Sequence, residues 1–320
     1  MYQSDDAYAS YLGISLSSLL ISNKSCEEIN IYILDIGISE TNKLKIQKTC
    51  GYYHRNCELI DCKDIEDYLQ NKGIPQYRDS YATYLKLYVR ERLPKGLDKL
   101  LYIDCDTVIT GDLSPLFERD LRDCPLGMVP DALAYQYKRK LGFEKDENYF
   151  NAGVILFQFD VWEEYGWDKR LDDYLHSHEM ATLNKHDQDI VNIVFRGSIA
   201  EIPVRYNMQS IYYASDLKSV YRVYGNVLTV SKEQLQIEKK NKVILHFLIF
   251  NGESPWNEDN EHPFHGIFDE CKSRSLWADL KPEKSHLNML YRIEKYLYQK
   301  LPGFSFLLLF RAVHDFFHLI

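Results

Sequence analysis

The sequence predicts an α/β fold, and three observations support this prediction. Glu28 to Leu34 alternates polar and apolar residues, as a half-buried strand does, and Cys57 to Asp61 is another short strand. Between them, Gly37 breaks the chain before a helical segment at residues 41–49. A third apolar run, Leu100 to Ile103, leads directly into two aspartates. Strands that alternate with helices in this way are typical of a sheet with parallel strands.

The remaining elements follow in chain order. A helical pattern covers residues 8–20, and Ser4, Asp5 or Asp6 is placed to cap it. Residues 80–92 form a predicted helix that stops before a proline. Further strands are expected at residues 125–129, within 148–157 and at 243–247, and further helices at residues 162–178 and 187–195.

Composition and charge limit the class of protein. With 320 residues, 45% of them hydrophobic, the chain can bury the core of one large domain or two. Its formal net charge of −9 argues against a general nucleic-acid binder. The seven cysteines include no C-x-x-C pair and no zinc-type spacing. Because the sequence also shows no signal peptide, we expect reduced thiols and a cytoplasmic location.

Two carboxylates follow the apolar run at residues 100–103. Asp104 and Asp106 are two residues apart, so their side chains share one side of an extended chain. Adjacent carboxylates repel unless a positive charge lies between them, and a hard divalent cation that also holds phosphate oxygens fits there. Cys105 lies between them and should point away, as a packing residue. We therefore predict a metal–diphosphate site at the carboxyl end of a central strand.

The same stretch permits other interpretations. Asp104 to Val108 also fits the D-x-D-x-[TV] pattern of haloacid-dehalogenase-like phosphatases, in which the first aspartate is a nucleophile. That class should carry a second acidic motif downstream, but after Gly111-Asp112 the position of the second acid holds Leu116. A nucleotidyltransferase would also use paired carboxylates, but it should have a glycine-rich phosphate loop near its start, and the sequence has none.

The C-terminal segment differs in composition from the rest of the chain. Since no linker is evident before about residue 280, we expect a main catalytic domain at residues 1–280 and a tail at residues 281–320. The tail is rich in Tyr, Phe and Leu, with basic residues spaced along it. Its most apolar stretch, residues 304–310, is too short to span a bilayer. The tail either lies in a membrane interface or packs on the main domain as a closing helix.

Six short segments of the chain share their order with a known family. They are Ser4 to Tyr8, Leu34 to Ser39, Leu101 to Asp106, Tyr149 to Val154, His186 to Ile190 and Leu245 to Phe247. Together they resemble family 8 glycosyltransferases, retaining enzymes that use a nucleotide-sugar and Mn²⁺, and in particular the bacterial lipopolysaccharide galactosyl- and glucosyltransferases. The resemblance implies the glycosyltransferase type A fold, a Rossmann-like architecture with a mixed, mostly parallel central sheet flanked by helices.

The resemblance implies roles in binding the metal and the base. Asp104 and Asp106, with His246 as the third protein ligand, would bind the Mn²⁺ that bridges the two phosphates of the donor, with Mg²⁺ as the alternative metal. Asp5 would hydrogen-bond the uracil ring, and Tyr8 would stack on it. Without the resemblance, His246 is interpreted as a buried core residue, and Asp5 and Tyr8 as a helix cap and a core tyrosine.

The resemblance also places residues around the donor sugar. Asn151 and Ala152 match contacts to the sugar, while Asp187 and Gln188 match positions that hold its hydroxyls and approach the anomeric carbon. Each has a structural alternative, since Asn tolerates the unusual backbone of a corner and Asp187 could cap the helix that begins there. Two further positions assigned to the donor site are Asp131, at the end of its own strand, and Cys105, inside the D-x-D motif.

Gln188 bears on how the stereochemistry is retained. A double displacement needs a nucleophile beside the anomeric carbon, and an amide is a poor one. We therefore favour front-face substitution, in which the departing phosphate oxygen takes the acceptor proton. In that mechanism Gln188 and Asp187 are the catalytic residues, and they orient and stabilise a cationic sugar.

Several positions depart from the pattern of the family. Lys86 stands where the family usually has Arg, which keeps the charge but loses the bidentate fork. After His246 the family tends to carry a Gly-x-x-Lys-Pro-Trp run whose Lys touches the diphosphate. Here Gly252 takes the place of the glycine, and Ser254 precedes the proline. Ala7 replaces a usual Asn near the base. These departures leave open a family member that binds nucleotide-sugars but turns them over weakly.

The expected activity is transfer of glucose or galactose from a UDP-sugar to a saccharide, lipid-linked or glycoprotein acceptor. The choice between the two sugars rests on one or two hydroxyl contacts, which the sequence does not reveal. We expect no nucleic-acid partner. The tail is expected to make peripheral contact with the inner face of the plasma membrane.

Overall fold

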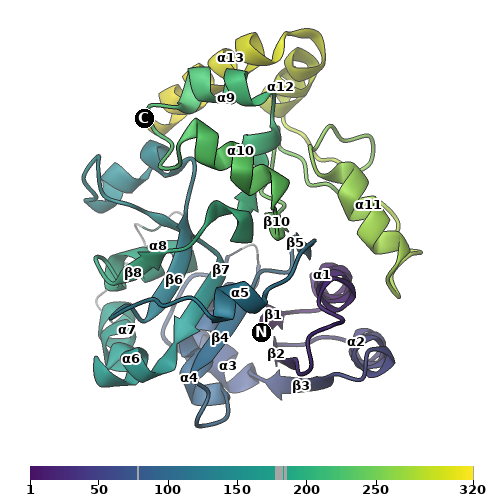
Figure 1. The fold of residues 1–320 in the computed structure, drawn as a ribbon, viewed down its shortest axis with the longest axis vertical. Coiled ribbons are helices and arrows are strands. Elements are labelled where there is room, and N and C mark those ends of the chain that lie inside the picture. The colour runs from purple at the N-terminus through teal and green to yellow at the C-terminus, as the bar shows by residue number, and fades with distance from the viewer. Residues whose placement is uncertain (78, 177–182, 184–185, 320) are drawn as a thin grey trace.

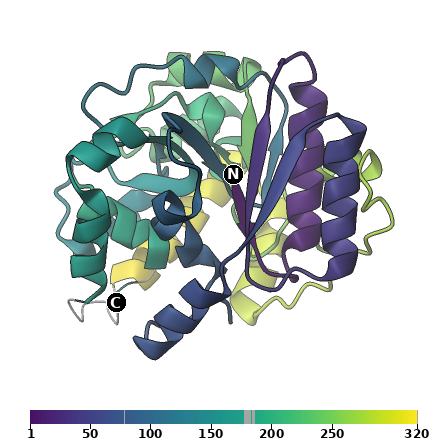
Figure 2. The same cartoon turned by 90° about the horizontal axis from the view of Figure 1, so that it is seen from below.

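The computed structural model describes residues 1–77, 79–176, 183 and 186–319, and it confirms the predicted α/β class (Figure 1). The N-terminal part is a parallel sheet in the order β1-β2-β3, with α1 and α2 side by side along it (Figure 2). Its elements are β1 (Tyr2–Ser4), α1 (Ala9–Ser22), β2 (Asn30–Asp35), α2 (Glu40–Tyr52), β3 (Asn56–Asp61) and α3 (Lys63–Asn71).

The start of α1 differs from the expectation that an acidic side chain caps it. The helix begins at Ala9, with Tyr8 in the N-cap position. Asp5 Oδ1 accepts the N–H of Tyr8 at 3.2 Å. A side chain that capped α1 would instead accept an N–H from the first turn of the helix. Asp6 reaches across to the start of α2, where it accepts the N–H of Ser39 at 2.8 Å. The acidic residues therefore shape the loop between β1 and α1, which borders the candidate site.

The second sheet contains the strand that ends in the two aspartates. Its order is β4-β7-β6-β8, with β7 antiparallel to both β4 and β6, and β8 parallel to β6. Two backbone hydrogen bonds, Met1 N to Leu101 O at 2.7 Å and Ile103 N to Met1 O at 3.0 Å, link β4 to the start of β1. The two sheets thus meet at β4. The strands are β4 (Lys99–Ile103), β6 (Leu126–Pro130), β7 (Phe150–Gln158) and β8 (Ile199–Glu201).

A small third sheet brings a distant part of the chain to the aspartates. Its order is β5-β10-β9, and the antiparallel β5–β10 register places His246 opposite Thr107. The N–H of Phe247 then donates to Asp106 O at 2.8 Å. This pairing, rather than any closeness in the sequence, sets His246 beside the two carboxylates. The strands are β5 (Thr107–Ile109), β9 (Met208–Gln209) and β10 (Ile244–His246).

Two expected helices take a different form. Much of the segment expected as one helix at residues 80–92 is a 3₁₀ helix, η1 (Ala82–Tyr88), followed by a single α-helical turn, α4 (Val89–Arg92). In η1 the N–H of Lys86 donates to Gln3 Oε1 at 2.7 Å. In an α-helix the same N–H would donate to the carbonyl four residues earlier.

The helix expected at residues 162–178 is interrupted at Gly166, where φ is +61° and the left-handed backbone favours glycine. It becomes α6 (Phe159–Glu164) and α7 (Trp167–Leu175), and its expected end at His178 lies outside the described residues. The other helices of this part are α5 (Ser114–Phe117), α8 (His186–Val194), α9 (Leu217–Tyr224), α10 (Lys232–Lys240) and α11 (His265–Ser273), with the 3₁₀ turns η2 (Ala134–Gln136), η3 (Lys138–Leu141), η5 (Val204–Tyr206) and η6 (Ser210–Tyr213).

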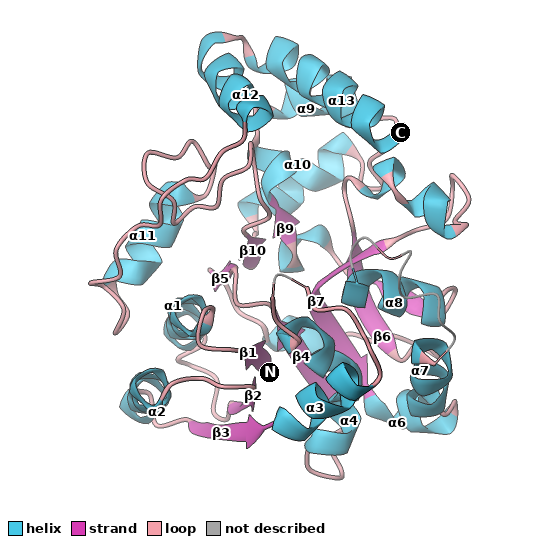
Figure 3. Ribbon diagram, turned by 180° about the vertical axis from the view of Figure 1, so that it is seen from behind, coloured by secondary structure: helices cyan, strands magenta, loops and turns pink. Residues whose placement is uncertain are grey.

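The C-terminal segment forms two helices, α12 (Met289–Lys300) and α13 (Gly303–Leu319), which lie with α9 at one end of the molecule (Figure 3). α13 packs on α9 and η2, and it buries Phe306, Leu307 and Phe310 in the same apolar cluster as α1 and β10. Among the described residues, no helix is long and apolar enough to cross a membrane.

Candidate active site

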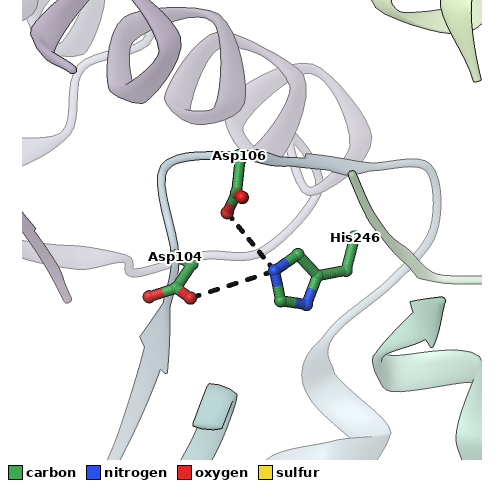
Figure 4. Close-up of side chains that lie close together, drawn as sticks. All are labelled: Asp104, Asp106 and His246. Carbon is green, nitrogen blue, oxygen red and sulfur yellow. Dashed lines mark ion pairs between the residues drawn. The ribbon is translucent and has the colours of Figure 1, made fainter. Parts of the chain in front are cut away.

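Three side chains converge where β4 ends (Figure 4). Asp104 and Asp106 lie in the turn between β4 and β5, and His246 is the last residue of β10. His246 Nε2 lies 3.3 Å from Asp106 Oδ1 and 3.9 Å from Asp104 Oδ2. One potential ligand atom from each residue lies within 4.8 Å of the other two. The group therefore has the composition and spacing to hold one divalent metal ion.

The imidazole of His246 is oriented by residues behind it. Asn207 Nδ2 donates to Asn151 Oδ1 at 2.8 Å, so Asn207 Oδ1 is left to accept from His246 Nδ1, which lies 2.9 Å away. Nδ1 then carries a proton, and Nε2, which faces both carboxylates, is the nitrogen that a metal ion would bind. The ring also lies against Gly153, where a Cβ would fall 2.1 Å from Cε1. Only glycine at position 153 leaves room for the ring in this position.

The charges of this group also fit a bound cation. Burial raises the pKa of Asp104, and repulsion from Asp106 raises it further, although Lys86 acts in the opposite direction. Burial by itself would lower the pKa of His246, but the charges of Asp106 and Asp104 raise it on balance. The two carboxylates lie close together and only partly exposed, and a divalent cation would compensate their charge.

Lys86 links the aspartates to the other half of the site. Its side chain is buried, and Nζ lies 2.7 Å from Asp187 Oδ2, 3.4 Å from Asp104 Oδ1 and 3.1 Å from Ala152 O. Burial opposes the charge of Lys86, but the two aspartates raise its pKa, so the ammonium stays protonated. Lysine can make these separate contacts from one point charge without the bidentate fork of arginine.

The amide of Gln188, in the first turn of α8, is fixed by its neighbours. Its Oε1 accepts from Asn151 Nδ2 and from the N–H of Ala152, each at 3.2 Å. Its Nε2 donates to Asp131 Oδ2 at 3.1 Å. Because the carboxylate of Asp131 can only accept and the N–H of Ala152 can only donate, the orientation of the amide is determined. Asn151, Ala152, Asp187, Gln188 and Asp131 thus form one connected group.

Two hollows of about 180 Å³ each meet at Asp104 and Asp106. The first, here called the β1 hollow, lies beside β1, and the second, the β7 hollow, lies beside β7. Tyr8, Tyr77 and Thr83 also border both hollows, so the two lie next to each other. The β1 hollow is lined by Gln3, Ser4, Asp5, Ala7, Tyr8, Tyr77, Ser80, Ala82, Thr83, Tyr102, Asp104, Cys105 and Asp106. The β7 hollow is lined by Tyr8, Tyr77, Thr83, Asp104, Asp106, Asn151, Ala152, Gly153, Asp187, Gln188, His246, Phe247, Leu248, Ile249, Ser254 and Trp256.

Most residues singled out in the sequence line these hollows, but three do not. Lys86 lies beneath the β7 hollow, and Asp131 lies behind Gln188. Gly252 is in a turn that packs on α12, where a Cβ would fall 2.5 Å from the ring of Tyr291. Cys105 borders the β1 hollow, but its thiol donates to Gln3 O at 3.1 Å, in keeping with a packing role.

Among the residues of the site that sequence reasoning missed, three stand out. Tyr77 and Thr83 border both hollows. Tyr77 precedes the expected helix and belongs to no motif, and Thr83 lies within that helix without a distinguishing pattern. Asn207, which orients His246, precedes a strand of only two residues. No local pattern marks these positions, because only the folded chain brings them to the site.

The α/β fold, with an Asp-Asp-His group where β4 ends, matches the type A architecture of solved glycosyltransferases. The model of the family described as glycosyl transferase family 8 matches residues 1–260. The chain therefore belongs to glycosyl transferase family 8.

Individual relatives agree with this assignment. General stress protein A of Bacillus subtilis is 24% identical over 275 residues, which cover 85% of this chain and 92% of that protein. The lipopolysaccharide 1,2-glucosyltransferase of Escherichia coli is 25% identical over 300 residues, or 88% of this chain and 79% of the relative. The crystal structure of galactosyltransferase LgtC with donor and acceptor sugar analogs has a TM-score of 0.68 at 27% identity, covering 86% of this chain and 95% of that one.

These findings confirm the resemblance inferred from the six segments, the type A fold and the prediction of a hexosyltransferase. The phosphatase interpretation of the aspartate motif is wrong, since the motif belongs to a glycosyltransferase fold.

Proposed function

We propose that the protein transfers glucose or galactose from a UDP-sugar, with retention of configuration, to a saccharide, lipid-linked or glycoprotein acceptor. The observation that carries this proposal is the Asp104, Asp106 and His246 group, placed where the two hollows meet. A nucleotide in the β1 hollow and a sugar in the β7 hollow would have the diphosphate between them at this group. We keep both glucose and galactose as candidate donor sugars, because the relatives include a glucosyltransferase and a galactosyltransferase.

Mn²⁺ is the metal we propose, held by the two carboxylates and Nε2 of His246. A bound metal would supply positive charge to a departing diphosphate. In the β1 hollow, the N–H of Tyr8 holds one carboxylate oxygen of Asp5. The carboxylate is thereby fixed in place and would accept a hydrogen bond from the base. The ring of Tyr8 would offer its face to the same base.

The β7 hollow has the groups that a donor sugar needs. Asp187, fixed by Lys86 at 2.7 Å, would accept from sugar hydroxyls. The amide of Gln188 has its carbonyl oxygen already occupied by Asn151 Nδ2 and the N–H of Ala152. Its nucleophilicity is thereby lowered further, which favours front-face substitution. An acceptor hydroxyl bonds to the anomeric carbon as the bond to the diphosphate breaks, and its proton moves to the departing phosphate oxygen. A sugar–enzyme adduct in intact-protein mass spectra would contradict this mechanism.

The tail is proposed to make peripheral contact with the inner face of the plasma membrane, as expected from its composition. Support comes from side chains on α12 and α13 that face solvent, with exposures of 79% for Met289, 60% for Tyr296 and 59% for Phe316. Sedimentation with anionic vesicles tests the proposal, and unchanged binding after substitution of these residues by Ser would contradict it. The division into a domain at 1–280 and a tail at 281–320 is part of the same proposal.

A donor panel tests the proposed function and its alternative, a member that binds donors but turns them over weakly. We expect UDP-glucose or UDP-galactose to raise the melting temperature only with Mn²⁺, since stabilisation follows the ratio of free ligand to Kd. Hydrolysis of the stabilising donor should accompany the shift. A shift without hydrolysis supports the alternative, and no Mn²⁺-dependent shift with any UDP-sugar would rule out both.

A further inference from the structure

The segment after His246 forms part of the wall of the active site. Residues 247–256, here called the donor loop, place Phe247, Leu248, Ile249, Ser254 and Trp256 in the lining of the β7 hollow. In the middle of this loop, residues 250–253 turn away from the hollow. What holds that turn therefore helps to set where the two lining parts of the loop lie.

The turn is a tight hairpin. The N–H of Phe250 donates to Glu253 O at 3.0 Å, and the N–H of Glu253 donates to Phe250 O at 2.9 Å. Asn251 and Gly252 have φ of +52° and +74°, the left-handed backbone that the two central residues of a type I′ turn require. Asn-Gly is the preferred pair at these positions, so the sequence specifies this turn locally.

Side chains of the C-terminal helices cover the hairpin. Phe250 is 3% exposed, and its ring centroid lies 5.2 Å from Tyr298, 6.3 Å from Phe306 and 6.1 Å from Phe310. Gly252 packs so closely on Tyr291 that a Cβ would overlap the ring. The hairpin is thus part of the apolar contact between α12, α13 and the rest of the protein.

An ion pair with a buried carboxylate completes this contact. Glu253 is 1% exposed, and Lys295 Nζ of α12 lies 2.9 Å from its Oε1. Glu253 also accepts from Ser285 Oγ and from the N–H of Glu261, each at 3.2 Å. Lys295 donates in addition to Asp259 O. A buried carboxylate with these partners is strongly destabilised when its cation is removed, so the pair resists separation of α12 from the loop.

We propose that Lys295 and Glu253 are positioning residues for donor binding, and that α12 and α13 hold the donor loop against the active site. The proposal rests on the proposed function, because it assigns the loop to the donor. Lys295 borders neither hollow, so its effect on a bound nucleotide would act through the loop. The C-terminal helices would then be required for donor affinity, although they contribute no residue to the lining of the two hollows.

The first experiment measures amide hydrogen exchange without any ligand, which keeps it independent of the proposed function. Lys295→Met is expected to accelerate exchange of the Phe250 and Glu253 amides at least about tenfold, because both close the hairpin. Lys300→Met, an exposed residue of the same helix, is the matched control and should leave these amides unchanged. Unchanged exchange in Lys295→Met would overturn the proposal.

The second experiment measures UDP binding by calorimetry in the presence of Mn²⁺, with hydrolysis of the active UDP-sugar as a kinetic readout. We expect Lys295→Met to raise the Kd of UDP and the KM of the donor roughly tenfold, with kcat within about twofold. Lys295→Arg, which keeps the charge, should restore most of the affinity. A merely structural role would lower the amount of active protein and leave KM unchanged.

The outcomes separate this inference from the proposed function. If the wild-type protein binds no UDP, the proposed function fails, and with it the assignment of the loop to a donor. If the wild-type protein binds UDP but Lys295→Met binds it equally well, only the inference fails. Should Lys295→Met not fold, Glu253→Gln removes the charge while keeping the shape of the side chain, and the same two assays apply to it.

Discussion

The metal-ligand group and the donor loop adjoin each other at His246, yet different forces hold them. Asp104, Asp106 and His246 are placed by strand pairing, since the register of β5 on β10 fixes where each side chain lies. The hairpin of the donor loop is held by side chains of α12 and α13, through an ion pair and aromatic packing. One wall of the site is therefore built into the sheet, whereas the other includes a loop whose hairpin contacts the C-terminal helices.

This difference predicts two kinds of defect. A substitution among the metal ligands should abolish the chemistry without loosening the fold, because backbone hydrogen bonds hold the strands. A substitution in the contact with the C-terminal helices should loosen the protein and weaken donor binding, because the contact is made by side chains. The predictions below test this contrast, from the largest expected effect to the smallest.

The largest effect is expected from the metal ligands. Asp104→Asn and His246→Ala should each lower donor turnover by at least about 10³-fold, or ~4 kcal/mol, because each removes a ligand from the proposed metal. Circular dichroism should show a folded protein, and the Mn²⁺-dependent thermal shift should disappear. Asp112→Asn, an exposed aspartate just after β5, is the control. Normal activity in either ligand variant would make the metal assignment wrong.

The next effect concerns stability on the side of the C-terminal helices. Phe250→Ala should lower the free energy of unfolding by about 3–4 kcal/mol, because a buried ring with three aromatic neighbours leaves a cavity. Phe316→Ala on α13 removes a ring that is 59% exposed and should cost far less. Denaturant unfolding measures both. Equal losses in the two variants would show that the hairpin is not held by these helices.

The contrast between the two regions also explains what the sequence could predict. Asp104 and Asp106 follow an apolar run at a fixed spacing, so local pattern was sufficient to locate them. His246 could be assigned only through family resemblance, because its partner in the sheet lies far away in the chain. The double ion pair of Lys86 depends on a 3₁₀ helix that the helical pattern did not distinguish from an α-helix.

Packing of the tail on the main domain was one expected alternative, but its contact with the hairpin at residues 250–253 could not be predicted. Gly252 matched a glycine of the family run and was therefore assigned to the donor, whereas the structure packs it on Tyr291. The pairing of Glu253 with Lys295 has no local signal, since neither residue belongs to a motif. Contacts of this kind arise only when the chain has folded, and they are the part of the site that sequence patterns leave open.

A third prediction concerns the glycine behind the metal ligands. Gly153→Ala places a methyl group where His246 Cε1 now lies, so the ring must shift away from the carboxylates. Mn²⁺ affinity should fall about 10–100-fold, as it does when other groups that orient metal ligands are changed. Titration with Mn²⁺ in the presence of UDP measures this. Gly51→Ala, where a Cβ meets no atom within 4 Å, is the control, and an unchanged Mn²⁺ affinity in Gly153→Ala would contradict the geometry.

The smallest effect tests whether the main domain also holds the donor loop. His262 is 3% exposed, and its Nε2 lies 3.0 Å from Leu248 O, while its Nδ1 accepts from the N–H of Phe264. The ring is therefore neutral, and burial lowers its pKa from 6.5 to about 4. On acidification the unfolded chain binds this proton near pH 6.5, but the folded protein does not until about pH 4. Stability is thus complete above pH 6.5 and falls as the pH drops towards 4.

Between pH 7 and 5.5, this histidine should account for about 1 kcal/mol of lost stability. His262→Gln should remove that loss and leave a flatter profile in denaturant unfolding, whereas His286→Gln, an exposed histidine, should not change the profile. If His262→Gln also leaves the UDP affinity unchanged while Lys295→Met lowers it, the C-terminal helices are the dominant support of the loop. If both variants weaken UDP binding equally, the main domain and the C-terminal helices both hold the loop. The contrast between sheet and side-chain support then applies only to the hairpin at residues 250–253.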